Sequence, residues 1–252
     1  MRNIHASDIW GAFLNHVSCS VGADIKQQQE PLIHDRHGVS AMSYVGMNQT
    51  HSNHVALISN ANGDDYCAQQ LLFDNESMVG VAPLTCDEFD VSKPITNHVH
   101  PIMGQCGRHY LVDCDALICN DSRVLLGVKT ADCLPIFIVG DGYFSVVHAG
   151  RVGTLDLISF NVVVAMRAYG VSNVSVWFGP ASCVCCYEID ANTRTHFDLI
   201  LSNRSQIQRV YPNASVYFSG DQYQCTQCAS DVFYSFRHGD QKKRNIFYLS
   251  AH

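Results

Sequence analysis

Residues 130–150 read TADCLPIFIVGDGYFSVVHAG, two apolar runs on either side of a Gly-Asp-Gly turn. Alternating and continuous apolar runs of this length flanked by turn residues are typical of a β-hairpin. With a two-residue loop at Gly140–Asp141, Cys133 lies directly opposite His148. Directly opposed residues point to the same face of a sheet with their Cβ atoms about 5 Å apart. The stretch therefore predicts that a thiol and an imidazole come together at the end of the hairpin.

A sulfur and an imidazole nitrogen at that separation suit a zinc ion. A third ligand has to come from another segment, and NHVHP at residues 97–101 is the strongest candidate because His98 and His100 alternate in a stretch expected to be extended. Three protein ligands leave a fourth position for water, as in catalytic zinc sites. From spacing alone, a half-buried histidine beside a packed cysteine is the favoured interpretation.

The composition limits the class of protein. The chain has 252 residues, 47% of them hydrophobic and 15% charged, with a formal net charge of −7. This balance disfavours a nucleic-acid binder, which needs clustered Lys and Arg to neutralise phosphates. The one cationic cluster, residues 242–244, is interpreted as a solvated loop.

The same composition favours a cytoplasmic protein. The first ten residues contain no apolar run of the secretory type, and no apolar stretch reaches the roughly 18 residues of a membrane helix. The twelve cysteines are therefore interpreted as mostly reduced thiols in the core. Neither a nucleic-acid partner nor a membrane partner is expected.

Working outward from the hairpin, short β-prone runs and amphipathic stretches alternate. Strands are expected within residues 110–120, 122–130, 134–140, 143–150, 174–179, 215–220 and 244–250, and helices over 155–169 and 192–202. Thr154 is the expected N-cap of the first helix and Gly170 its end. The nearly continuous apolar character of the strands predicts a sheet covered on both faces. We expect one α+β domain over residues 1–252, a mixed β-sheet sandwich layered with helices.

The remaining cysteines give a weaker signal. Cys225 and Cys228 form a Cys-x-x-Cys pair. No second such pair at a suitable spacing is recognised, because the spacing of Cys183, Cys185 and Cys186 is interpreted as unsuitable for a metal site. All five are therefore interpreted as structural thiols.

Two acids flank a cysteine further upstream. Asp113 and Asp115 lie on either side of Cys114. They can orient the ligands of a metal site or simply form a turn, and the turn is the favoured interpretation.

Several motifs together resemble the YfiH-like laccase-domain family, also named polyphenol oxidase or purine nucleoside phosphorylase. They are TADCLPI at 130–136, HAG at 148–150 with Gly153, GPASCVCCYEI at 179–189, CT at 225–226 and FYSFR at 233–237. NHVHP falls where the family has a Gln-Val-His-Gly type motif, and RHGVS at 36–40 resembles its N-terminal Gly-Val-Ser segment. The resemblance is specific from about residue 97 to 250.

The resemblance implies a zinc ion held by His100, Cys133 and His148. Family members act on purine nucleosides, cleaving the N-glycosidic bond with phosphate and deaminating adenosine, and an older attribution is copper-dependent phenol oxidation. One departure is notable: the family usually has His-Ala-Gly-Trp-Arg-Gly, whereas residues 148–153 are HAGRVG. The position of Arg151, and with it the affinity for phosphate, is therefore open.

These observations predict a zinc enzyme that acts on adenosine, inosine or methylthioadenosine. A metal-activated water is expected to attack C6 in deamination. The turn from Gly150 to Gly153, with the Arg151 guanidinium, is a candidate phosphate site, with an ordinary glycine-rich turn as the alternative. Glu188 or Asp132 is a candidate proton-transfer group, although a structural hydrogen-bonding role fits each equally well.

Three alternatives stay open. Cys133 and His148 can form the nucleophile and base of a metal-independent hydrolase or amidase. A copper-dependent polyphenol oxidase is disfavoured, because one mononuclear site does not provide the several copper ions that oxygen reduction needs. A structural zinc site requires a fourth protein ligand, for which Cys114 and His98 are candidates. The sequence does not predict an oligomeric state.

Overall fold

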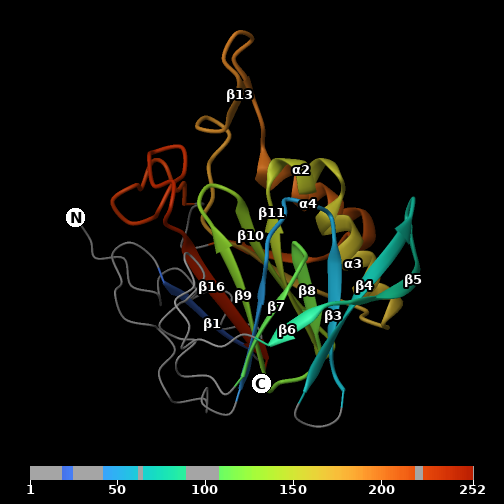
Figure 1. Ribbon diagram of the computed structural model, residues 1–252. Coiled ribbons are helices and arrows are strands. Elements are labelled where there is room, and N and C mark those ends of the chain that lie inside the picture. The colour runs from blue at the N-terminus through green and yellow to red at the C-terminus, as the bar shows by residue number, and fades with distance from the viewer. Residues whose placement is uncertain (1–18, 25–41, 62–64, 89–107, 219–223, 252) are drawn as a thin grey trace.

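The computed structural model describes residues 19–24, 42–61, 65–88, 108–218 and 224–251. Two β-sheets face one another, and helices cover the outer face of the larger sheet (Figure 1). This arrangement confirms the predicted α+β sandwich layered with helices. None of the helices in the described ranges is long and apolar enough to cross a membrane.

The smaller sheet has six strands and mixed directions. β2 runs parallel to its neighbours β7 and β9, whereas the other pairs are antiparallel. Its order is β1 (Cys19–Asp24), β16 (Asn245–Ala251), β9 (Val124–Thr130), β2 (Ser43–Met47), β7 (His109–Val112) and β6 (Cys86–Glu88).

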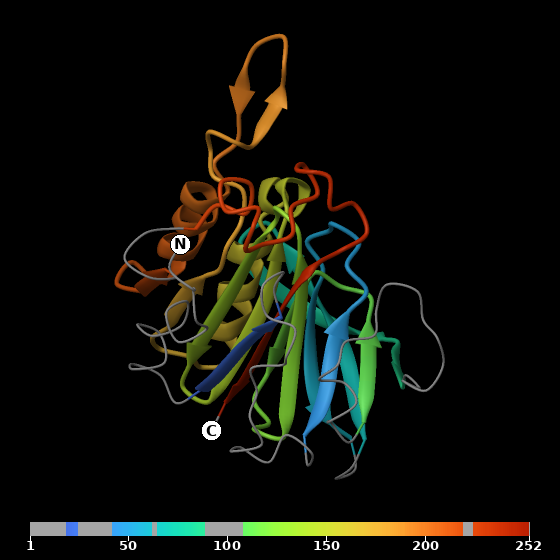
Figure 2. The same cartoon turned by 90° about the vertical axis from the view of Figure 1, so that its left-hand side faces the viewer.

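The larger sheet has eight strands, with parallel pairs only between β12 and β15 and between β3 and β8. Its order is β15 (Ser215–Phe218), β12 (Ser175–Phe178), β10 (Leu134–Gly140), β11 (Tyr143–Ala149), β8 (Ala116–Cys119), β3 (Val55–Asn60), β4 (Tyr66–Asp74) and β5 (Ser77–Leu84). A separate hairpin of β13 (Glu188–Asp190) and β14 (Thr195–His196) projects from one end of the sandwich (Figure 2).

The larger sheet separates two apolar cores. Phe137 on β10 points to the core between the sheets, and its neighbours Ile136 and Ile138 point to the core under the helices, because successive side chains of a strand alternate faces. The helices over this second core are α3 (Ile158–Ala168) and α4 (Leu199–Val210), and the short α2 (Arg151–Leu155) precedes α3. β10 and β11 are therefore buried on both faces, as their apolar sequence predicts.

The β10–β11 hairpin forms, but its predicted register is wrong. The loop is Asp141–Gly142, and Pro135, not Cys133, lies opposite His148. Asp141 and Gly142 both have positive φ, at 45° and 82°, which is the type I′ turn that Asp-Gly favours. The shift advances the pairing by two positions, so Cys133 stays on the same face as His148 and becomes its diagonal neighbour.

The predicted helices differ from the observed ones. The stretch 155–169 contains the end of α2 and all of α3, because Leu157 adopts a left-handed conformation with φ of 66° and interrupts the helix. Gly150, not Thr154, is the N-cap of α2, while Gly170 follows α3 as predicted. The other predicted helix begins later: residues 192–198 include β14, and α4 begins after Asp198, whose carboxylate accepts a hydrogen bond from Leu201 N–H.

Candidate functional site

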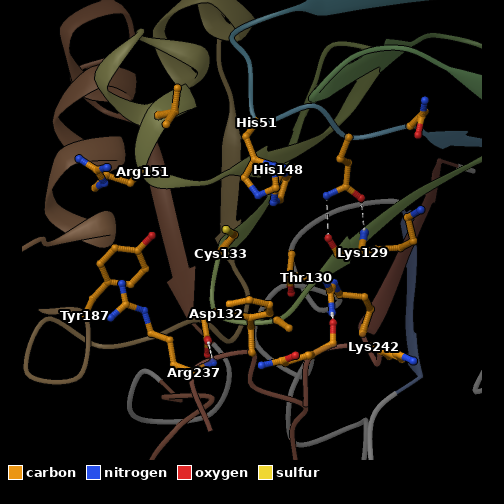
Figure 3. A pocket seen from close by; sticks show the side chains of 17 residues that line it. His51, Lys129, Thr130, Asp132, Cys133, His148, Arg151, Tyr187, Arg237 and Lys242 are labelled. Carbon is orange, nitrogen blue, oxygen red and sulfur yellow. Dashed lines mark hydrogen bonds between the residues drawn. The ribbon is translucent and has the colours of Figure 1, made fainter. Parts of the chain in front are cut away.

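A cavity of about 680 Å³ opens at the end of the sandwich where β9 ends and β10 begins. It is lined by three segments far apart in sequence: residues 48–51, residues 129–133 and residues 236–244. His148 and Arg151, from the end of β11 and the start of α2, complete this part of the wall. The cavity is therefore formed at the ends of the central strands (Figure 3).

His51, Cys133 and His148 converge in this cavity (Figure 3). One ligand atom from each lies within 4.8 Å of the other two. The two imidazole rings are edge to face, with centroids 4.8 Å apart. A Cβ on Gly150 would lie 3.1 Å from Cys133 Sγ and 3.3 Å from His51 Cδ2. A glycine at this position keeps the space beside the three donors open.

Asp115 holds both histidines. Its carboxylate lies 2.7 Å from His148 Nδ1, which leaves Nε2 as the nitrogen available for a metal ion. The backbone N–H groups of His51 and Ser52 and the hydroxyls of Thr50 and Ser52 also donate to Asp115. This buried carboxylate therefore orients one imidazole directly and fixes the loop that carries the other, which is more than the turn role that its sequence context favours.

The charges in this group are strongly coupled. Burial alone would raise the pKa of the Cys133 thiol, but His148 and His51 outweigh it and lower that pKa to about 6. Burial alone would lower the pKa of His148, but Cys133 and Asp115 raise it to about 9. Asp115 has its pKa held below the ordinary range because its bonds to His148 and Ser52 outweigh its burial. Without a metal ion, the pair is a thiolate and an imidazolium at neutral pH.

The structure brings together two of the three predicted ligands. Cys133 and His148 lie in one group, whereas His100 and His98 fall outside the described residues. His51 is the third member of this group and was missed by the sequence analysis. Nothing in its surroundings, MNQTHSN, has the spacing of a metal motif. Cys114 is buried and does not belong to a metal-ligating group within the described ranges.

Positive charge lines the cavity, although the chain is acidic overall. The cationic residues are Lys129, Arg151, Arg237, Lys242 and Arg244. Burial, with a smaller contribution from Arg244, lowers the pKa of Lys129 to about 8. Residues 242–244 are thus more than a solvated loop, since Lys242 and Arg244 reach the cavity wall. Arg151 lies on one side of Cys133, and Lys129 and Lys242 lie on the other (Figure 3).

Two aromatic side chains also line the cavity, buried Tyr187 and exposed Phe236. The Arg237 guanidinium lies 4.3 Å from the centre of the Tyr187 ring and donates to the carbonyl oxygen of Glu188. At this point the wall of the cavity therefore combines an aromatic ring with a cation that lies over it.

Of the two candidate proton-transfer groups, Asp132 lines the cavity and Glu188 does not. The carboxylate of Asp132 accepts hydrogen bonds from Thr226 Oγ1, Ser235 Oγ and Arg237 N–H. It is buried and fixes the surrounding loops, which favours its structural role. Gly150 lies beside the three donors and Arg151 lines the cavity, so the turn that contains both stays a candidate phosphate site.

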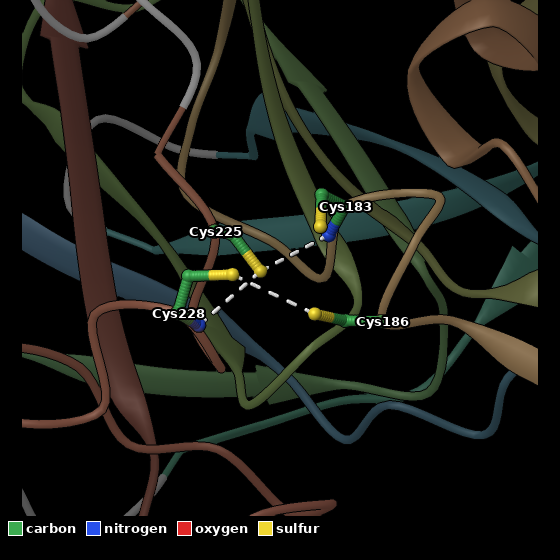
Figure 4. A group of neighbouring side chains, drawn as sticks. All are labelled: Cys183, Cys186, Cys225 and Cys228. Carbon is green, nitrogen blue, oxygen red and sulfur yellow. Dashed lines mark hydrogen bonds between the residues drawn. The ribbon is translucent and has the colours of Figure 1, made fainter.

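A second group of cysteines lies apart from this cavity. Ligand atoms of Cys183, Cys186, Cys225 and Cys228 all lie within 4.8 Å of one another (Figure 4). The spacing argument against them was therefore wrong: Cys183 and Cys186 are themselves a Cys-x-x-Cys pair, and the fold brings them to the second pair. These four residues, the four-cysteine cluster, could hold a metal ion.

The sequence also matches a known protein family. The profile of the multi-copper polyphenol oxidoreductase laccase family matches residues 21–246. The chain belongs to this family. The predicted laccase-domain resemblance is thereby confirmed.

Relatives and solved structures agree with this assignment. A purine nucleoside phosphorylase of Aquifex aeolicus is 33% identical over 91 residues, 36% of this laccase-domain chain and 44% of the relative. Adenosine deaminase RL5, from an unknown prokaryotic organism, is 29% identical over 150 residues, 49% of this chain and 56% of the relative. The chain thus matches only about half of the length of these curated relatives.

The fold is shared with the hypothetical protein YfiH of Bacillus licheniformis. The TM-score is 0.61 at 17% identity, covering 96% of this chain and 94% of that structure. Protein NMB0706 of Neisseria meningitidis has a TM-score of 0.54 at 19% identity, covering 83% and 75%. At these identities the likeness concerns the fold alone.

Proposed function

We propose that this laccase-domain protein is a zinc-dependent enzyme of purine nucleosides. The expected reactions are phosphorolysis of the N-glycosidic bond of adenosine, inosine or methylthioadenosine and hydrolytic deamination of adenosine. The convergence of Cys133, His148 and a further histidine in a cavity lined with cations carries the proposal. The names of the relatives, purine nucleoside phosphorylase and adenosine deaminase, support the substrate class.

The residues fit a zinc ion. A thiolate and imidazole nitrogens are its usual ligands, and Asp115 accepts from the second nitrogen of a ligand histidine as in many zinc sites. The glycine beside the donors leaves room for an ion and for substrate. When bound, zinc supplies Lewis acidity that activates water or polarises substrate.

The third ligand is supplied by His51 or by His100. His51 is favoured by its place beside Cys133 and His148, and His100 by the family resemblance. Three protein ligands suffice for a catalytic site, so we expect one of these histidines to be essential for zinc binding.

The remaining wall residues have roles that follow from their chemistry. Arg151 and the other cavity cations offset the charge of phosphate, whose oxygen forms the new bond to C1′ of the sugar. The glycosidic electron pair leaves with the purine, which takes up a proton. Tyr187 and Phe236 present aromatic surface suitable for contact with a purine ring.

Metal content and turnover of single variants test the proposal. Cys133→Ala and His148→Ala should lose the catalytic zinc and lower turnover of adenosine about 10³-fold or more, because several kcal/mol of transition-state stabilisation are removed. The apolar cores should keep the fold intact, as checked by circular dichroism. Full activity in either variant would contradict zinc catalysis.

His51→Ala and His100→Ala, compared in the same assay, identify the third ligand. The one that loses zinc is the ligand. His54→Ala is the matched control, because this exposed histidine lies near His51 and outside the cavity lining. Retention of zinc by both test variants would contradict a three-ligand site.

A second candidate is a metal-independent hydrolase or amidase. The lowered pKa of Cys133 and the raised pKa of His148 are those of an activated thiolate and its base. A freshly purified protein without metal that turns over an amide substrate through a covalent Cys133 intermediate would favour this candidate. Loss of all activity on zinc removal, with recovery on zinc addition, would exclude it.

A further inference from the structure

The four-cysteine cluster is built from two Cys-x-x-Cys segments on different loops. Cys183 and Cys186 lie between β12 and the projecting β13–β14 hairpin. Cys225 and Cys228 lie between β15 and β16. A parallel bridge between Ala181 and Cys225 brings the two loops together. The cluster is therefore a product of the fold, with each loop contributing one pair.

The separations of the sulfur atoms suit one metal ion. All four ligand atoms lie within 4.8 Å of one another, and Cys186 Sγ is 3.6 Å from Cys228 Sγ. Four sulfurs around a zinc ion at about 2.3 Å are separated from one another by roughly 3.8 Å in a tetrahedron. The observed separations lie close to this value. None of the four lines the catalytic cavity.

The backbone is arranged to support negative charge on sulfur. Cys183 N–H and Cys228 N–H both point at Cys225 Sγ, at 3.3 Å and 3.5 Å (Figure 4). Cys186 N–H and Tyr187 N–H both donate to the carbonyl oxygen of Cys183 and close a tight turn between the two cysteines of the first pair. Amide donors to sulfur of this kind stabilise thiolates.

The cluster is linked to the wall of the catalytic cavity. Thr226, inside the second pair, donates to the carboxylate of Asp132, and Ser182 N–H donates to the carbonyl oxygen of the same residue. Asp132 directly precedes Cys133. Tyr187, which directly follows the first pair, lines the cavity together with Arg237. An ion that fixed the two loops would therefore fix this part of the wall.

We propose that Cys183, Cys186, Cys225 and Cys228 bind one structural Zn²⁺ ion, separate from the catalytic site. Binding converts four thiols into four Zn–S bonds and releases four protons to solvent. The fully coordinated ion has no open position, so it takes no part in the reaction. Its role is to hold in place the base of the β13–β14 hairpin and the part of the cavity wall that Tyr187 forms.

Zinc content of a protein that lacks the catalytic site tests the proposal. In the Cys133→Ser background, purified under reducing conditions, we expect one zinc per chain by elemental analysis. Adding Cys186→Ser should remove it. Adding Cys185→Ser should not, because Cys185 is an exposed neighbour outside the cluster. Equal loss in the two variants, or no zinc in the parent, would overturn the proposal.

A second measurement uses the wild-type protein, so it does not depend on the folding of a variant. Replacement of zinc by Co²⁺ should give the strong sulfur-to-cobalt absorption of a tetrahedral four-thiolate site. An organomercurial thiol reagent should release the ion as these four thiols react. Iron in place of zinc, or a disulfide between cluster cysteines in protein purified without oxidant, would contradict a zinc site.

Discussion

The His51–Cys133–His148 group and the four-cysteine cluster are the two groups of potential metal ligands in the described part of the chain. The first has one sulfur and two imidazoles in a cavity lined with cations. The second has four sulfurs at the meeting of two loops and does not line that cavity. Three donors leave an ion open to substrate, and four close it. The number of donors and the space beside them separate the two proposed roles.

The two groups also differ in how their donors are held. A buried carboxylate, Asp115, orients His148 and the His51 loop. In the four-cysteine cluster, backbone N–H groups surround Cys225 instead. Asp115 thus orients one ligand histidine directly and fixes the loop of the other, whereas the bond from Cys183 N–H to Cys225 Sγ connects the two loops of the cluster. Asp132 joins the two regions through its bonds to Thr226 and to the loop of Arg237.

Among the substitutions that separate the two groups, Asp115→Asn should have the largest effect. It should weaken zinc binding by the His51–Cys133–His148 group and leave the four-cysteine cluster unchanged. We expect the affinity of the proposed catalytic zinc to fall about 10- to 100-fold, because the negatively charged carboxylate that orients His148 is replaced by a neutral amide. Competition with a chromophoric chelator measures both sites in one titration, and the four-cysteine cluster should keep its affinity.

Asp113→Asn is the matched control for that substitution. Asp113 is two residues away and exposed, and its carboxylate accepts from Asn48 Nδ2. A similar loss of zinc affinity in both variants would show that the effect is not specific to the bond with His148.

The pH dependence of thiol alkylation should distinguish Cys133 from the four-cysteine cluster. In protein freed of zinc, Cys133 is a thiolate above pH about 6, because His148 and His51 outweigh its burial. Cys186 stays protonated at pH 7, since burial and its sulfur neighbours raise its pKa. We expect iodoacetamide to modify Cys133 about tenfold faster than Cys186 at pH 7, as measured by mass spectrometry of peptides.

His148→Ala gives the control for this measurement. Removing the imidazolium leaves the burial of Cys133 in place, so its pKa should rise and its reaction at pH 7 should slow. An alkylation profile unchanged by the substitution would show that His148 does not set the charge of Cys133.

The fold and two members of the candidate site, Cys133 and His148, could be predicted from local patterns. The β10–β11 hairpin placed Cys133 and His148 on one face even though the register was wrong, because the shift of two positions preserves the face. Asp141–Gly142 was the stronger turn signal within Gly-Asp-Gly, since a type I′ turn needs positive φ at both central residues. The apolar stripe of 155–169 could not reveal the break at Leu157, which no residue type there signals.

The position of His51 and the assembly of the four-cysteine cluster depend on contacts between segments that are distant in sequence. His51 reaches the site through backbone bonds to Asp115, 64 residues away in sequence, and no local motif marks it. The four-cysteine cluster could have been recognised as two Cys-x-x-Cys pairs, but Cys185 obscured the first one. That the pairs meet depends on the bridge between Ala181 and Cys225, which only the fold provides.

Arg151→Ala should have the smallest effect. It tests whether the cavity beside the His51–Cys133–His148 group binds phosphate. Arg151 stands where the family usually has Trp, is exposed and lines the cavity. Loss of one exposed cation should raise the KM for phosphate in phosphorolysis about 5- to 10-fold, close to 1 kcal/mol. Deamination uses no phosphate and should change little. Arg151→Lys should restore part of the phosphate affinity, while equal effects on both reactions would place Arg151 outside the phosphate site.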